Sequence, residues 1–103
     1  MLASGARLSA VTATLQQRIR TAIQAALRYP AAAAAMQLTR RAQVQLDYQS
    51  GAVRNIQLKQ SAGTPLLDRA ALSAVRDARY PAAPAEIGDW PLLLLVWVEL
   101  QMT

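Results

Sequence analysis

Several residue types that carry common protein chemistry are absent from this sequence of 103 residues, which has no cysteine, no histidine and no phenylalanine. Without cysteine there is neither a disulfide nor a thiol nucleophile. Without histidine, the commonest general base and a usual zinc ligand are also missing. We therefore expect a protein that is not an enzyme, with no catalytic residues, no metal and no cofactor.

Acidic residues are scarce, with six against eleven basic ones, and the net charge is +5. The six carboxylates include no close pair with the spacing of a general acid and base, and no glycine-rich phosphate-binding motif is present. The positive charge favours phosphates or acidic proteins without specificity. Because there is no Arg/Lys run and no aromatic platform, we expect no nucleic-acid binding.

Long hydrophobic runs are also lacking, because no stretch reaches the roughly 18 apolar residues that a membrane-spanning helix needs. The N-terminus does not have the pattern of a signal peptide. The hydrophobic share of 53% is enough for one small core. We expect a soluble chain with two parts: an N-terminal amphipathic helix or extension over residues 1–28, and a single domain over residues 29–103.

What is present begins with an amphipathic pattern over residues 7–28, where large apolar residues recur every four positions. They are Val11, Leu15, Ile19, Ile23 and Leu27. This spacing predicts one helix, which should end near Tyr29 because Pro30 disfavours helical geometry in the residue before it. The helix could cover a sheet or form a dimer. After Pro30, a second short helical turn running to about Leu38 is plausible.

Two strands and a helix are predicted in the middle of the chain. Residues 42–49 alternate between apolar and polar, Ser50-Gly51 forms a turn, and residues 53–60 form the second strand of a hairpin. Val53 has the wrong parity for the buried face, so we expect a bulge or an irregular turn near Gly51 and Ala52. Thr64 and Pro65 then suit the first positions of a helix that runs to about Arg79.

The last predicted element is a strand over Leu92 to Leu100, which is apolar on both faces. The element order predicts an α+β fold of the form α-β-β-α-β, with a three-stranded antiparallel sheet and two helices on one face. The last strand then lies at an edge, although the same pattern suits a central strand covered on both faces. Trp97 is either a partner contact or a core residue.

An uncovered edge strand offers unpaired N–H and C=O groups to another extended chain. Proteins usually suppress such edges, and this run carries one charge, Glu99, near its end. We therefore predict a binding module in which a peptide adds as a further strand. The alternative is a structural assembly domain that forms a homodimer through this edge or through the first helix.

Short motifs follow one another in a characteristic order between residues 28 and 100 and end in the apolar strand. They are Tyr29-Pro30, Gly51-x-Val53, Val53-x-Asn55-Ile56-x-Leu58, Ser61-Ala62-Gly63, Leu67-Asp68-x-Ala70-Ala71-Leu72 with Val75, and Tyr80-Pro81. Together they resemble the C-terminal domain of the TonB energy-transducer family, over about three quarters of the chain. The related TolA domain is less similar, because the Ser-Ala-Gly turn and the Leu-Asp helix favour TonB.

The resemblance implies a periplasmic domain, tethered to the inner membrane by a preceding anchor through which inner-membrane motor proteins act. It implies capture of the Ton box peptide of outer-membrane transporters beside the last strand, in uptake of cargo such as siderophores or iron. The partner-binding residues it implies are Arg28, Tyr29, Pro30, Leu92, Leu93, Leu94, Leu95, Val96, Trp97 and Val98. The sequence departs from the family pattern just upstream of Tyr29, where Ala26, Leu27 and Arg28 replace the usual Gln-Pro residues.

Overall fold

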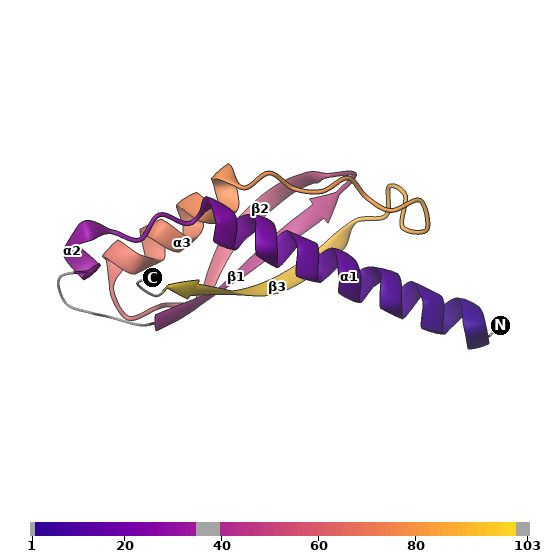
Figure 1. Ribbon diagram of the computed structural model, residues 1–103, viewed down its shortest axis with the longest axis horizontal. Coiled ribbons are helices and arrows are strands. Elements are labelled where there is room, and N and C mark those ends of the chain that lie inside the picture. Colours follow the sequence, from indigo (N-terminus) through magenta and orange to yellow (C-terminus); the bar gives the residue numbers. More distant parts are fainter. Residues whose placement is uncertain (1, 35–39, 101–103) are drawn as a thin grey trace.

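The structure of the protein, a computed structural model, describes residues 2–34 and 40–100. Figure 1 shows a sheet with one long helix and one shorter helix packed on it. The elements in chain order are α1 (Leu2–Ala26), α2 (Ala31–Ala34), β1 (Arg40–Gln49), β2 (Ala52–Gln60), α3 (Pro65–Asp77) and β3 (Leu92–Leu100).

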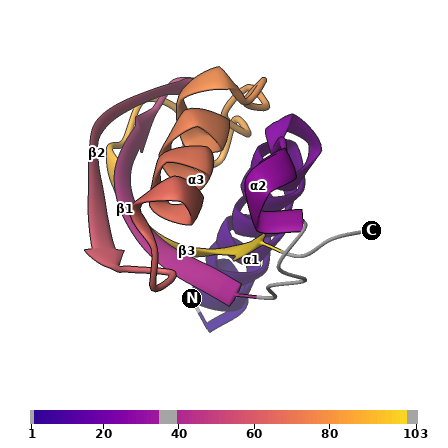
Figure 2. The ribbon, with the colours of Figure 1, turned by 90° about the vertical axis from the view of Figure 1, so that its left-hand side faces the viewer.

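The three strands form an antiparallel sheet in the order β2-β1-β3. Figure 2 shows α1 and α3 on the same face of this sheet, with the other face uncovered. The predicted α+β fold is confirmed, and so is the place of the last strand at an edge. The first strand is central because it pairs with both others.

Helix α1 begins at Leu2, before the predicted start, and ends at Ala26, two residues before the predicted end at Arg28. In its last turn the Leu27 N–H bonds the Gln24 carbonyl at 3.3 Å, a tighter i to i−3 contact. Its N-terminal half extends past the sheet (Figure 1). The predicted second turn is α2, and the part of that prediction beyond Ala34 lies outside the described residues.

The apolar stripe of α1 faces the sheet, as predicted for a covering helix. Leu15, Ile19 and Ile23 are at most 1% exposed and belong to the same hydrophobic core as the strands. These three side chains are buried within the chain itself, so they are not available to a helix-mediated dimer.

The hairpin turn is where the sequence predicts it, but the bulge is not. Ser50 and Gly51 both have positive φ, 52° and 83°, as a tight two-residue turn between twisted strands requires. The register shifts lie further along β2, opposite the steps Gln43/Val44 and Gln45/Asp47 of β1. The expectation of a bulge at Gly51 and Ala52 is therefore wrong, because the turn itself is regular.

Helix α3 is specified by its first turn. The Thr64 hydroxyl accepts a hydrogen bond from the Leu67 N–H at 3.2 Å, and Pro65 follows as the first helical residue. The Asp68 carboxylate also accepts the Ala62 N–H at 2.7 Å and the Ser61 hydroxyl at 2.6 Å, which holds the preceding turn onto the helix. The helix ends at Asp77, two residues before the predicted end.

The core lies between the sheet and the two helices. Its aliphatic centre comes from alternate residues of β1 and β3, from α1 and from α3. Two tyrosines tie the loop after α3 to this centre: Tyr48 donates to the Pro81 carbonyl at 2.7 Å, and Tyr80 donates to the Val75 carbonyl. Within the described residues, no helix has both the length and the apolar character that a membrane crossing requires.

Candidate functional site

Strand β3 has a strand neighbour on one flank only. It pairs with β1 in nine consecutive positions, from Arg40 opposite Leu100 to Tyr48 opposite Leu92, without a register shift. On the flank away from β1, here called the free flank, no strand of the described chain pairs with it. A regular, unbulged edge of this kind is a suitable template for a further strand.

Side chains of β3 alternate between the core and the uncovered sheet face, as predicted. The core side holds Leu94, Val96, Val98 and Leu100, with Leu92 half-buried. On the uncovered face, Leu93 is 65% and Leu95 56% exposed. Two large aliphatic side chains thus lie on the surface beside the free flank, where a peptide added to β3 can contact them.

Strand β2 forms the opposite edge of the sheet and is a poorer template. Two register shifts interrupt it, and Asn55 has a positive φ of 52°. Its exposed residues include Arg54 and Lys59. Bulges and charges are the devices that keep edge strands from pairing with other chains. Of the two edges, β3 is therefore the more regular one.

A hydrogen-bonded contact from α1 shows which main-chain groups of β3 point to the free flank. The Gln24 side-chain amide donates to the Glu99 carbonyl at 3.0 Å and accepts from the Glu99 N–H at 2.7 Å. Main-chain directions alternate along a strand, so the same flank carries the N–H and C=O groups of Leu93, Leu95 and Trp97. These are the groups that an added strand would pair with.

A shallow groove runs between α1 and β3 at this flank. It has a volume of about 190 Å³ and is lined by Ala13, Gln16, Gln17, Arg20, Leu95, Val96 and Trp97. The helix side of the groove is polar and the strand side is apolar. An extended peptide lying in it would have main-chain partners on one side and side-chain amides with one guanidinium on the other.

Trp97 lies on the uncovered face of the sheet and is half-buried, so it is not part of the core. The guanidinium of Arg41, opposite Glu99 on β1, lies 4.1 Å from the centre of the indole ring. At this distance the guanidinium and the indole ring make a cation–π contact. Of the two alternatives for Trp97, the surface position is the one found.

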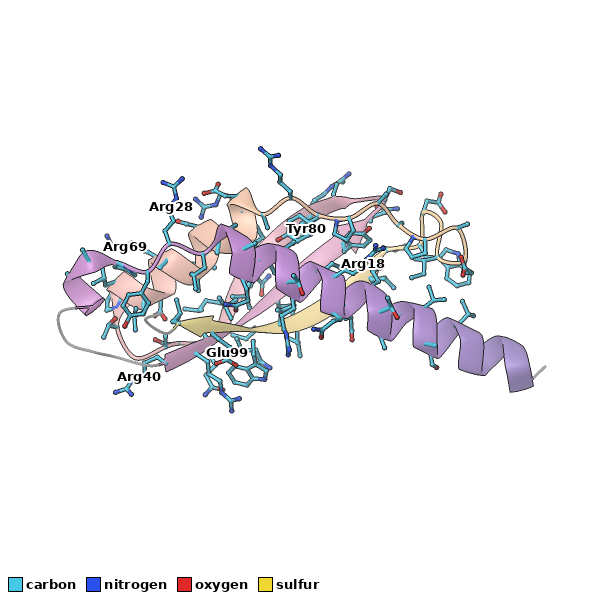
Figure 3. All side chains as sticks on the ribbon, viewed as in Figure 1. Arg18, Arg28, Arg40, Arg69, Tyr80 and Glu99 are labelled. Carbon is cyan, nitrogen blue, oxygen red and sulfur yellow. The ribbon has the colours of Figure 1, made fainter. Side chains whose placement is uncertain are left out.

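Three predicted site residues lie elsewhere. Arg28 and Pro30 line a pocket with residues of α3, among them Arg69 and Asp77. Figure 3 shows Arg28 beside α3 in the upper part of the view, whereas Glu99 lies lower, at the strands. Tyr29 between them packs against the core. The structure thus brings Leu93, Leu95 and Trp97 together on the free flank, but not the segment around Tyr29.

Gln24 is the residue of the free flank that the sequence analysis missed. Its position directly after Ile23, on the border of the apolar stripe of α1, is the one signal that could have drawn attention to it. A polar residue at such a border is common in amphipathic helices, so the pattern gives no partner. The contact with Glu99 joins residues far apart in sequence and becomes visible only in the fold.

Titratable side chains are the groups of the described residues that could carry chemistry or hold a metal. Among residues 2–34 and 40–100, no cluster of acidic side chains is arranged to hold a metal ion. The pKa values of Tyr48 and Tyr80 are raised, above all by burial, to about 12 for Tyr80. The Tyr48 hydroxyl donates to a main-chain carbonyl of the segment that follows α3, and the Tyr80 hydroxyl donates to a main-chain carbonyl of α3 itself, so both hydroxyls have a structural role.

Comparisons with known proteins agree with this architecture. The family described as Gram-negative bacterial TonB protein C-terminal matches residues 25–91. The NMR solution structure of the TonB C-terminal domain of Helicobacter pylori is similar, with a TM-score of 0.63 and 26% sequence identity, over 86% of this chain and 97% of that one. A comparison with curated proteins gave no match. Because the family match spans well over half of the chain, the protein belongs to the TonB C-terminal domain family of Gram-negative bacteria.

Proposed function

We propose that the free flank of β3 captures an extended peptide, the Ton box of an outer-membrane transporter, by adding it to the sheet as a fourth strand. Membership of the TonB family implies interaction with outer-membrane transporters. The observation that carries the proposal for this flank is that β3 is unbulged, apolar and unpaired away from β1. This is the surface that β-strand addition requires.

Main-chain groups supply the affinity in this proposal. The N–H and C=O groups of Leu93, Leu95 and Trp97 point to the free flank, and each hydrogen bond made there contributes about 0.5–1.5 kcal/mol. The exposed side chains of Leu93 and Leu95 add apolar contacts to every second residue of the guest. Leu92, Leu94, Val96 and Val98 act from the core side by holding the strand in place.

The segment around Tyr29 has no direct contact with the guest in this proposal. Arg28 and Pro30 lie beside α3, and the groove along β3 is lined by other residues. If Arg28, Tyr29 and Pro30 bind the partner, as the resemblance implies, they do so at a second contact point on the transporter.

The family implies a periplasmic location and a part in energy-coupled transport across the envelope. We extend the proposal to a tether in the inner membrane, through which motor proteins pull on the captured peptide. A strand held by several main-chain bonds in parallel suits such a load, because the bonds share it. Siderophores or iron are the proposed cargo class.

A proline substitution tests the main-chain part of the proposal. In Leu95→Pro the N–H that faces the free flank is lost, while the ladder to β1 is kept because its bonds come from the neighbouring residues. We expect affinity for a Ton box peptide to fall by about tenfold or more. Leu95→Ala, which keeps the N–H, should stay within about threefold of wild type. Isothermal titration calorimetry measures both.

A modified guest provides a test that leaves the protein unchanged. Ton box peptides N-methylated at alternate residues lose one set of main-chain donors, so one of the two methylated forms should not bind. Amide signals of Leu93, Leu95 and Trp97 should shift on addition of the unmodified peptide. Shifts confined to β2 or α3, or equal binding of both methylated forms, would refute strand addition at β3.

A second candidate function is pairing of two copies through the same flank, as in a structural assembly domain. The exposed Leu93 and Leu95 favour it, since apolar surface beside an open strand edge also suits a second copy of the chain. Sedimentation velocity over a concentration series separates the two functions. A monomer at high protein concentration that still binds peptide supports capture, and a dimer that dissociates on peptide addition shows competition for one flank.

A further inference from the structure

The side chain of Gln24 imitates a strand at one position of the free flank. A primary carboxamide has the same donor and acceptor groups as a peptide unit, and Gln24 uses one of each on the N–H and C=O of Glu99, at 2.7 and 3.0 Å. An added strand would make the same two hydrogen bonds with that residue. On the free flank the main chain of Glu99 is therefore already paired, although no strand of the described chain lies on that side.

The position of Gln24 is fixed by the core. Ile23, directly before it, is fully buried, and Ile19 one turn earlier is also fully buried. These two side chains hold the last turns of α1 against the sheet, so the backbone of Gln24 is already ordered beside Glu99 and only its side-chain rotamers remain to be fixed. Displacing the amide therefore means giving up two part-buried hydrogen bonds.

The rest of the free flank is open. The groove between α1 and β3 passes Leu95 and Trp97 and is lined on the helix side by Gln16, Gln17 and Arg20, all of them exposed. No hydrogen bond from these three side chains to β3 is present in the structure. The flank thus divides into an open part, Leu93 to Trp97, and a closed position at Glu99.

We infer that Gln24 sets the register of the strand that adds to β3. Its amide occupies the pairing position of Glu99, so a guest peptide pairs with Leu93 to Trp97 and ends there. The inference rests on the proposed function for the identity of the guest, but the closure of Glu99 is a property of the protein alone. Gln24 is thus a positioning residue: it fixes where the guest strand ends and needs no other contact with the guest.

Hydrogen exchange in the full 103-residue chain without a guest tests the closure directly. In the wild type we expect the Glu99 amide to be protected, while the amides of Leu95 and Trp97 exchange fast because they face the open flank. Gln24→Leu keeps a similar side-chain volume but has no amide, so the protection at Glu99 should be lost. Gln57→Leu, the same change at an exposed position of β2, should leave Glu99 protected.

Peptide length tests the register. Three Ton box peptides are compared. The first matches the open part in length, the second has two more residues at the N-terminus, and the third has two more at the C-terminus. Whichever direction the added strand takes, one of the two longer peptides then extends past Glu99. In the wild type neither longer peptide should bind more tightly. In Gln24→Leu the one that extends past Glu99 should gain about fivefold or more from the added hydrogen bonds, and the shortest should not.

The outcomes separate this inference from the proposed function. An unprotected Glu99 amide in the wild type overturns the inference. An equal gain in affinity for the longer peptide in the wild type and in Gln24→Leu also overturns it. Strand addition itself survives both results. If none of the peptides binds the wild type or Gln24→Leu, the proposed function fails, and the register inference fails with it. The exchange experiment then still decides whether Gln24 closes Glu99. Melting temperatures of the two Leu variants check that both remain folded.

Discussion

At the scale of single residues, two tyrosines anchor the segment that leads from α3 to β3. Tyr48 is fully buried on β1 and donates to the Pro81 carbonyl, and Tyr80 donates to the Val75 carbonyl near the end of α3. Gly51 approaches the same segment closely, since a Cβ added there would lie 3.6 Å from the Pro81 oxygen. The start of β3 is thus positioned by contacts of the hairpin with the loop before it.

These tyrosines predict a loss of stability at alkaline pH. Burial raises the pKa of Tyr80 from 10.0 to about 12, so the folded state keeps a proton that the unfolded chain releases. Stability from this group is therefore complete below about pH 10 and is lost as the pH rises toward 12. Tyr48, whose pKa burial also raises, acts in the same direction.

Urea unfolding midpoints at neutral pH and near pH 11 measure this effect. We expect the unfolding midpoint of the wild type to be clearly lower near pH 11 than at neutral pH. The difference should be smaller for Tyr80→Phe, because phenylalanine retains the ring but cannot ionise. If Tyr80→Phe loses as much stability with pH as the wild type, the Tyr80 hydroxyl does not carry the linkage.

At the scale of elements, a bulge in β2 decides which of its residues face the core. Gln45 lies opposite Gln57 and Asp47 opposite Arg54, so β2 has one more residue than β1 between these pairs. In this step β2 has two residues, Asn55 and Ile56, where β1 has only Leu46. Asn55 has a positive φ, and its side-chain amide donates to the Asp47 carboxylate at 2.7 Å. Val53 and Ile56 can thus both turn to the helix side, as their half-buried positions require.

Substitutions at Asn55 test the bulge. Valine strongly disfavours positive φ, whereas glycine adopts it freely, so we expect Asn55→Val to be about 1 kcal/mol less stable than Asn55→Gly in urea unfolding. Both variants lose the hydrogen bond to Asp47, which makes them a matched pair. Equal stability of the two would mean that β2 can pair with β1 without the left-handed residue.

At the scale of the whole molecule, α1 is part of the structural core although the family match begins only at residue 25. Its three buried side chains share a cluster with residues of β1, α3 and β3. The helix also places Gln24 on the free flank. The predicted division between residues 1–28 and 29–103 stays a prediction, but the core crosses it.

Removal of one buried side chain of α1 tests how far the molecule depends on this helix. Ile19→Ala should lower the free energy of unfolding by about 2–5 kcal/mol, because it leaves a cavity in the shared core. Arg20→Ala, the next residue and exposed, should stay within about 0.5 kcal/mol of wild type. Helical circular dichroism and tryptophan fluorescence should report one transition. Separate transitions would mean that α1 unfolds independently of the sheet.

Features governed by neighbouring residues were predictable from the sequence. Thr64 and Pro65 carry the geometry of a helix start in their own side chains, and the nine-residue run from Leu92 to Leu100, apolar except for Glu99, gives a strand of the observed length. The C-terminal ends of α1 and α3 were predicted less accurately, each two residues too late, since Leu27 and Ala78 bear no side chain that fixes a helix end.

The sequence by itself determined the elements, their order and the apolar character of the last strand, because each depends on the period of side chains along a few neighbouring residues. Tertiary structure alone decided where β2 bulges, that Trp97 lies under Arg41 on the surface, and that Gln24 pairs with Glu99. Those outcomes depend on the packing of segments that are far apart in the chain. Local periodicity contains no information on which polar group of a helix will meet which main-chain group of a strand edge.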